Sequence, residues 1–124
     1  MINKPNGSGI TRIIKATQCS VQGFHAAWTN EAAFRQEALL AIIMFPASFW
    51  LAESLSQWAV LVGVLLLVII VELLNSAIEA LTDRVSLERH ELSGRAKDMG
   101  SAAVTCSLLI VTLVWGAALF EKLQ

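Results

Sequence analysis

The stretch LSQWAVLVGVLLLVIIV (residues 55–71) carries no charge along its 17 residues and passes without a break into ELLNSAIEALTDR (72–84). As a helix, it would cover roughly 26 Å at about 1.5 Å per residue, close to the ~30 Å hydrocarbon core of a bilayer. Glu72 is therefore expected near one membrane surface. An ionised side chain costs roughly 2.5–3.5 kcal/mol at the centre of a membrane helix, so a carboxylate this close to the hydrocarbon needs an explanation.

The polar residues that follow this segment share one face of a helix. Glu72, Asn75, Glu79 and Asp83 fall at i, i+3, i+7 and i+11, a spacing that aligns their side chains in a single stripe. Glu72 and Glu79 would lie roughly 10 Å apart along the axis, which favours two different roles. The pattern is typical of a proton acceptor at the lipid boundary with a metal or phosphate site farther out, as transfer from a soluble nucleotide to a lipid hydroxyl requires.

The composition predicts a single all-α domain, residues 1–124, that is integral to a membrane. Of the 124 residues, 56% are hydrophobic, and two more apolar segments lie at 38–52 and 99–120. We expect membrane spans at about 31–52, 55–83 and 94–121, with the last helix starting near Ser93 and Gly94. Lys97 would then lie close to its N-terminus, where free N–H groups and the helix dipole favour anions.

The segment at about 10–29 predicts an amphipathic helix lying on the membrane surface. Ile10, Ile13, Val21, Phe24 and Trp28 recur at helical spacing, with polar residues on the other faces.

The basic residues predict how the chain is oriented. Eight of the nine precede the first apolar segment (38–52) or lie between the second (55–71) and the third (99–120): Lys4, Arg12, Lys15, Arg35, Arg84, Arg89, Arg95 and Lys97. By the positive-inside rule, the N-terminus and the loop after residue 82 are cytoplasmic, beside cytosolic ATP. The net charge of −1 gives no reason to expect a nucleic-acid partner.

Each candidate residue also has a purely structural interpretation. Glu72 is a candidate general base, or a carboxylate paired with Lys97. Glu31 and Glu79 are candidate Mg²⁺ ligands, or ordinary surface charges on a helix. Lys97 is a candidate phosphate ligand, or half of a snorkelling pair with Asp98. No P-loop and no protein-kinase signature is present, so a kinase would have to be of another kind.

Three segments resemble the bacterial integral-membrane diacylglycerol kinase family: EAAFRQE (31–37), VELLNSAIEALTDR (71–84) and HELSGRAKDMGSAA (90–103). The resemblance extends over nearly the whole chain. It implies a homotrimer of three-span subunits in the bacterial inner membrane, with active sites shared between neighbouring subunits. Its implied reaction is phosphorylation of diacylglycerol by MgATP to give phosphatidic acid.

The resemblance also implies roles for individual residues. Glu72 would accept the proton of the lipid hydroxyl, with Asn75 in support, and Glu31 and Glu79 would bind Mg²⁺. The implied ATP contacts are Arg12, Cys19, Glu31, Glu79, Glu88, Arg89, His90, Lys97 and Asp98. The implied lipid contacts are Arg12, Ala33, Phe34, Arg35, Gln36, Glu37, Trp50, Trp58, Glu72 and Ser101. Cys19 stands where the family pattern has Tyr, which removes a ring for stacking on the nucleotide.

Two alternative functions remain open from the sequence. The first is a related undecaprenol kinase, which would use the same site on a polyprenyl alcohol. The second is a non-catalytic helical subunit or small transporter whose polar stripe binds a partner or an ion.

Overall fold

The computed structural model describes residues 7–124 as four helices: α1 (Gly9–Asn30), α2 (Ala32–Leu51), α3 (Leu55–Val85) and α4 (Glu91–Lys122). The last three are long and apolar enough to cross a membrane. The prediction of an all-helical chain with three helices of membrane length is confirmed. Lys4, one of the basic residues behind the expected orientation, lies outside the described residues.

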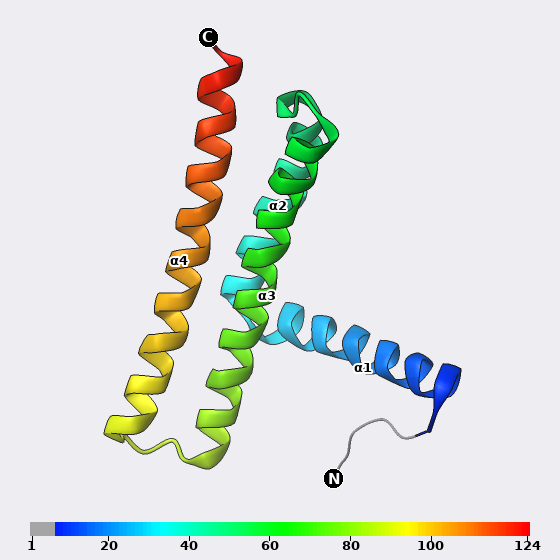
Figure 1. The fold of residues 1–124 in the computed structure, drawn as a ribbon. Coiled ribbons are helices and arrows are strands. Elements are labelled where there is room, and N and C mark those ends of the chain that lie inside the picture. The colour runs from blue at the N-terminus through cyan, green and yellow to red at the C-terminus, as the bar shows by residue number, and fades with distance from the viewer. Residues whose placement is uncertain (1–6) are drawn as a thin grey trace.

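The three long helices run side by side, whereas α1 turns away from them at one end (Figure 1). α4 packs mainly against α3, α3 also packs against α2, and the main neighbour of α1 is α2. A short turn after α2 leads to Ser54, whose hydroxyl accepts a hydrogen bond from the Gln57 N–H at 3.0 Å. This N-cap satisfies one free donor of α3 and fixes its first residue.

The start of α4 differs from our expectation by three residues. The helix begins at Glu91 because His90 caps it: the His90 Nδ1 accepts a hydrogen bond from the Leu92 N–H at 3.0 Å. Ser93 and Gly94 are already helical. Lys97 is thus the seventh helical residue, beyond the four free N–H groups of the first turn. The expectation that it lies where those groups bind anions was wrong.

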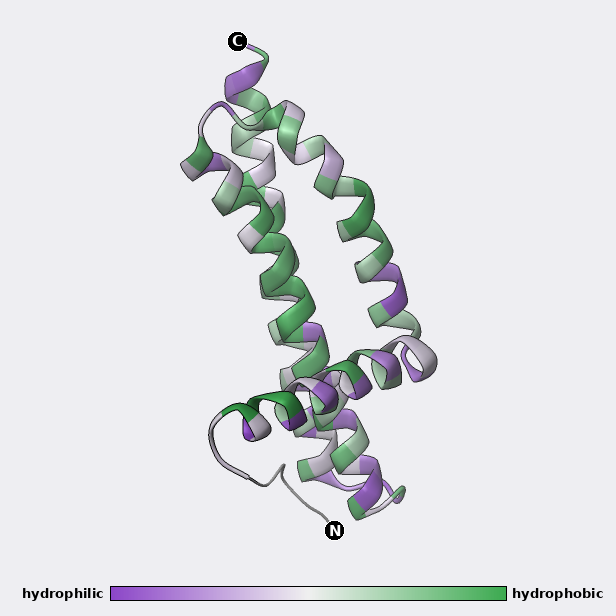
Figure 2. Cartoon of the chain, turned by 90° about the vertical axis from the view of Figure 1, so that its right-hand side faces the viewer, coloured by the Kyte–Doolittle hydropathy of each residue, from purple (hydrophilic) through white to green (hydrophobic). Residues whose placement is uncertain are grey.

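A buried apolar cluster lies at the end of the molecule away from Glu72. Leu51, Leu61 and Ala118 form a small buried cluster there, and the Trp115 Nε1 donates a hydrogen bond to the Leu61 carbonyl at 3.1 Å. Most other apolar side chains of the long helices are exposed. Figure 2 shows the resulting hydrophobic zone along the middle of these helices. In a membrane, lipid or further protein covers such a surface.

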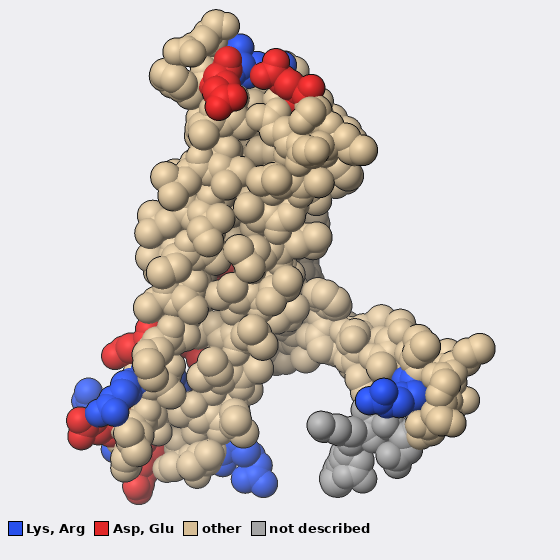
Figure 3. Space-filling model, in the orientation of Figure 1, with Lys and Arg blue, Asp and Glu red and all other residues tan. Residues whose placement is uncertain are grey.

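The charged side chains gather at the two ends of the helical bundle and leave an almost uncharged band between them (Figure 3). Among residues 7–124, one charged residue, Glu72, is buried, with 2% of its surface exposed. The fold therefore places the Glu72 carboxylate inside the bundle, directly after the uncharged sequence of α3.

Candidate functional site

Glu72 is held in place by its own helix. Its Oε2 accepts a hydrogen bond from the Ser76 hydroxyl at 3.1 Å, and Ser76 is buried as well. The two residues are one turn apart on α3, which brings their side chains together on the same face. Glu72 is therefore restrained by a neutral donor, and no cation of residues 7–124 forms an ion pair with it.

A second carboxyl group, from α2, meets Glu72. The Glu37 side chain lies within hydrogen-bonding reach of the Glu72 carboxyl. The Glu37 Oε2 is buried and has no hydrogen-bond partner within residues 7–124. Two carboxyl groups, one from α2 and one from α3, thus lie side by side at the membrane boundary.

The stripe on α3 becomes more exposed with distance from Glu72. Asn75 and Glu79 are half-buried, and Asp83 is exposed. Four charged side chains act electrostatically on the Glu79 carboxylate: Glu31, Glu72, Asp83 and Lys97. Three of them are negative, so the region has an excess of negative charge that a divalent cation would offset.

This donor set fits a Mg²⁺ ion that also binds nucleotide phosphates. No group of three or more His, Cys, Asp or Glu side chains in the described part of the chain is arranged to hold a metal alone. Mg²⁺ commonly takes only one or two protein carboxylates and completes its coordination with phosphate oxygens and water. Glu31 and Glu79 could supply those two carboxylates.

Lys97 lines a polar cavity where the loop between α3 and α4 joins the two helices. Its Nζ lies 2.7 Å from the Asp83 Oδ1, so its ion-pair partner is Asp83 and not Glu72. The cavity, of about 480 Å³, is lined by Thr82, Asp83, Ser86, Leu87, Glu88, Arg89, His90, Glu91, Ser93, Gly94 and Lys97. Both partners of the ion pair are partly exposed, and solvent weakens such a pair, so Lys97 can exchange Asp83 for a phosphate.

Asp98 lies on a different face of α4 from its neighbour Lys97. It lines a shallow surface hollow together with Glu91, Arg95 and Met99. Within one chain, Asp98 therefore does not line the cavity to which Lys97 belongs.

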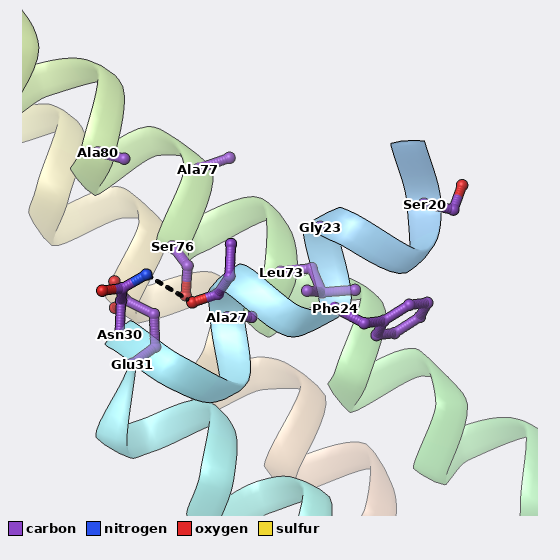
Figure 4. A pocket seen from close by; sticks show the side chains of 11 residues that line it. Ser20, Gly23, Phe24, Ala27, Asn30, Glu31, Leu73, Ser76, Ala77 and Ala80 are labelled. Atoms are coloured by element: carbon purple, nitrogen blue, oxygen red, sulfur yellow. Dashed lines mark hydrogen bonds between the residues drawn. The ribbon is translucent and has the colours of Figure 1, made fainter. Parts of the chain in front are cut away.

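Glu31 lies at the junction of α1 and α2, where it faces a largely apolar cavity of about 650 Å³ (Figure 4). The walls are α1 on one side and α3 on the other, and the residues include Gly23 and Ala27 from α1 and Ser76 and Ala80 from α3. The small side chains explain why this space is open.

Two residues implied as lipid contacts also stabilise this junction. The Arg35 guanidinium donates hydrogen bonds to the carbonyls of Trp28 and Thr29, at 2.8 and 3.3 Å, and so satisfies the C-terminal end of α1. The Phe34 ring is 4% exposed and packs against Phe24. Their observed contacts are therefore structural.

The remaining residues implied by the resemblance are dispersed over the surface of a single chain. Five are exposed and make no side-chain contact that would mark a site: Arg12, Cys19, Ala33, Gln36 and Ser101. Trp50 and Trp58 belong to the other end of the bundle, where Lys122 lies 4.9 Å from the Trp50 ring centre. Trp58 is fourteen residues before Glu72 on α3, roughly 21 Å along the axis.

Two polar contacts of the site were not predicted from the sequence. The Ser76–Glu72 hydrogen bond joins residues at i and i+4 on one helix, and that spacing was a usable signal for it. The Asp83–Lys97 pair joins residues fourteen positions apart on two helices, and only the geometry of the α3–α4 turn reveals it.

Substituting Ser76 with Ala is expected to lower kcat about tenfold, because a hydrogen bond to a charged group contributes about 1.5–3 kcal/mol and each 1.36 kcal/mol is tenfold in rate. Steady-state phosphoryl transfer measures this loss. Ser107→Ala is the matched control: Ser107 is also buried but bonds to the Val104 carbonyl of its own helix. Equal rates for both variants would contradict a role for Ser76 in orienting Glu72.

Comparison with known proteins identifies relatives over most of the chain. The sequence profile of the family described as prokaryotic diacylglycerol kinase matches residues 18–119. The chain is 53% identical over 112 residues to a diacylglycerol kinase of Pseudomonas aeruginosa, covering 90% of this chain and 91% of that protein. It is 50% identical over 113 residues to that of Haemophilus influenzae, covering 91% and 96%. It is also 50% identical over 110 residues to the diacylglycerol kinase of Escherichia coli (strain K12), covering 89% of this chain and 90% of that protein. With its buried carboxylate and three membrane-length helices, the chain belongs to the prokaryotic diacylglycerol kinase family.

Proposed function

We propose that this protein is an ATP-dependent lipid kinase that phosphorylates the hydroxyl of diacylglycerol to give phosphatidic acid. The observation that carries the proposal is the buried Glu72, at the end of an uncharged membrane segment with polar residues continuing outward along the same helix face. This placement suits a substrate whose hydroxyl lies at the lipid boundary while the nucleotide is in water.

In the proposed reaction, the lipid hydroxyl oxygen attacks the γ-phosphorus of ATP in line with the leaving oxygen of ADP. The hydroxyl proton passes to Glu72, the new O–P bond forms, and the bond from the γ-phosphorus to the bridging oxygen of ADP breaks. Ser76 orients the Glu72 carboxylate through its hydrogen bond to Oε2. Phosphoryl transfer of this type depends mainly on positioning and charge stabilisation.

Mg²⁺ is the proposed cofactor, and Glu31 and Glu79 are its proposed protein ligands. When bound, the ion supplies positive charge that offsets the charge developing on the phosphate oxygens. The excess of carboxylates around Glu79 supports this assignment.

Substituting Glu79 with Gln is expected to raise the Mg²⁺ concentration for half-maximal activity by about tenfold or more, because the neutral amide offers a weaker ligand to a hard cation. A Mg²⁺ titration at saturating lipid measures the shift. Glu121→Gln, at the other end of the bundle, is the control and should leave the titration unchanged. A lower kcat with an unaltered Mg²⁺ dependence would contradict the metal role.

The proposed nucleotide site includes the cavity of Lys97 and the loop of Glu88, Arg89 and His90. Arg12, Cys19 and Asp98 would join it from a neighbouring subunit, because α1 projects away from the other helices (Figure 1) and Asp98 lies on another face of α4. A homotrimer with shared active sites would account for this dispersal. It would also cover exposed helix surface, since only 33% of the most apolar stretch of α3 is buried within one chain.

The proposed location is the bacterial inner membrane, with the N-terminus and the α3–α4 loop in the cytoplasm. The basic residues of that loop support the orientation. α1 would then rest on the cytoplasmic membrane surface, where its exposed Ile10, Ile13 and Val21 could enter lipid. The diacylglycerol would be contacted by residues 33–37 near Glu72 and by Ser101, with Trp50 and Trp58 contacting lipid at the opposite membrane surface.

Transfer of labelled γ-phosphate from MgATP tests the function directly. Purified protein in detergent micelles is given either diacylglycerol or undecaprenol, and the labelled lipid is identified. Labelled phosphatidic acid is the expected product. Labelling of undecaprenol alone would overturn the substrate assignment, and labelling of neither lipid would overturn the kinase activity.

A further inference from the structure

The contact between Asn75 of α3 and Gly100 of α4 is unusually close. A Cβ built on Gly100 would overlap the Asn75 Oδ1 and lie 3.2 Å from the Asn75 Cγ. Gly100 is buried, whereas Cβ atoms built on Gly63 and Gly116 meet nothing within 4 Å. The absence of a side chain at residue 100 is thus what allows the Asn75 amide to lie against α4.

The Asn75 Oδ1 is buried and accepts no hydrogen bond from residues 7–124. Its neighbour on α4 is the Gly100 Cα, whose hydrogen stands where a Cβ would otherwise be. A Cα–H···O contact is weak but favourable for a carbonyl oxygen, whereas an NH₂ group in the same place would face a C–H with nothing to donate to. The contact therefore selects the amide orientation with the oxygen toward α4 and the nitrogen directed away from it.

The Asn75 nitrogen is then free to face the region between Glu72, the proposed base, and Glu79, a proposed Mg²⁺ ligand. Asn75 lies roughly 4.5 Å beyond Glu72 along the axis and roughly 6 Å short of Glu79, on the same stripe. In the proposed reaction, the transferred phosphoryl group passes through this interval. An amide NH₂ is a hydrogen-bond donor that suits the oxygens of a phosphoryl group.

We propose that Gly100 is a positioning residue, whose missing side chain holds the Asn75 amide with its NH₂ directed at the transferred phosphoryl group. This inference rests on the proposed kinase function. Gly100 acts only through Asn75 and touches neither substrate.

Gly100→Ala tests the proposal, with Gly116→Ala and Gly63→Ala as matched controls in the same two helices. The added methyl group is expected to displace the amide and lower kcat by about 10²-fold, as a misplacement near 1 Å does, with little change in the KM for lipid. The controls should retain wild-type kcat. Wild-type kcat for Gly100→Ala would overturn the proposal.

A double-mutant cycle separates positioning from helix packing. In an Asn75→Ala background, the methyl group at residue 100 has no amide to displace, so Gly100→Ala should cost nothing further. Equal losses in both backgrounds would overturn the proposal. If Gly100→Ala alone fails to fold, the double variant should fold again and have the activity of Asn75→Ala. Failure of both to fold would assign Gly100 to helix packing and reject the inference.

A readout independent of turnover distinguishes this inference from the kinase proposal itself. The ¹⁵N–¹H side-chain signals of Asn75 should shift in Gly100→Ala and stay in place in Gly116→Ala. Unshifted signals would reject the positioning role even if the protein proves to be a kinase. If the signals shift but the protein has no kinase activity, the contact between Asn75 and Gly100 is supported and the proposed kinase function is rejected.

Discussion

Replacing Glu72 with Gln is expected to lower phosphoryl transfer by about 10²- to 10⁴-fold, the usual contribution of a positioned general base. Glutamine keeps the size of the side chain, and its amide oxygen can still accept the hydrogen bond from Ser76. The fold should therefore survive while the proton acceptor is lost. Transfer of labelled γ-phosphate to diacylglycerol measures the rate, and circular dichroism and gel filtration check the fold.

Glu53→Gln is the control for this loss. Glu53 is exposed in the turn between α2 and α3, at the opposite end of the uncharged segment from Glu72. Its neutralisation should leave turnover unchanged. A Glu72→Gln protein that folds and retains more than about a tenth of wild-type kcat would remove Glu72 as the base.

Replacing Lys97 with Met is expected to reduce kcat/KM for ATP by about 10²- to 10³-fold, the usual loss when one preorganised donor to a developing negative charge is removed. Methionine keeps most of the length and apolar surface of the lysine side chain but cannot donate to a phosphate. Because the Asp83 carboxylate would lose its partner at 2.7 Å, the cavity would also become more negative and repel ATP. Initial rates at varied ATP and fixed lipid measure the change.

Lys122→Met tests whether any lysine near a membrane surface would have this effect. Lys122 lies at the end of α4 away from the proposed nucleotide cavity, over the Trp50 ring. Its loss should leave the KM for ATP unchanged. Equal changes in the two variants would show that net charge, and not a phosphate contact by Lys97, determines ATP affinity.

The sequence predicts the features of this protein that depend on local periodicity. Uncharged runs of 15 to 22 residues identify the three long helices, and the spacing of Glu72, Asn75, Glu79 and Asp83 places them on one face of α3. The rise in exposure from Glu72 to Asp83 follows from the length of the uncharged segment before Glu72. These features follow from the geometry of one helix.

Contacts between helices were harder to predict from one sequence. Lys97 pairs with Asp83 because α3 and α4 are antiparallel and joined by a short turn, and its expected place at the start of α4 was wrong because His90 caps that helix earlier. Arg35 satisfies the carbonyls at the end of α1, a role that depends on the angle between α1 and α2. The close approach of Gly100 to Asn75 likewise depends on how two helices pack.

The stereochemical course of transfer tests the central claim, that the γ-phosphoryl group passes directly from ATP to the diacylglycerol hydroxyl beside Glu72. ATP made chiral at the γ-phosphorus with oxygen isotopes is the substrate, and the configuration of the phosphatidic acid is determined. A single in-line displacement inverts the configuration, and inversion is the expected result. Retention would require a phosphorylated enzyme intermediate and would contradict direct transfer.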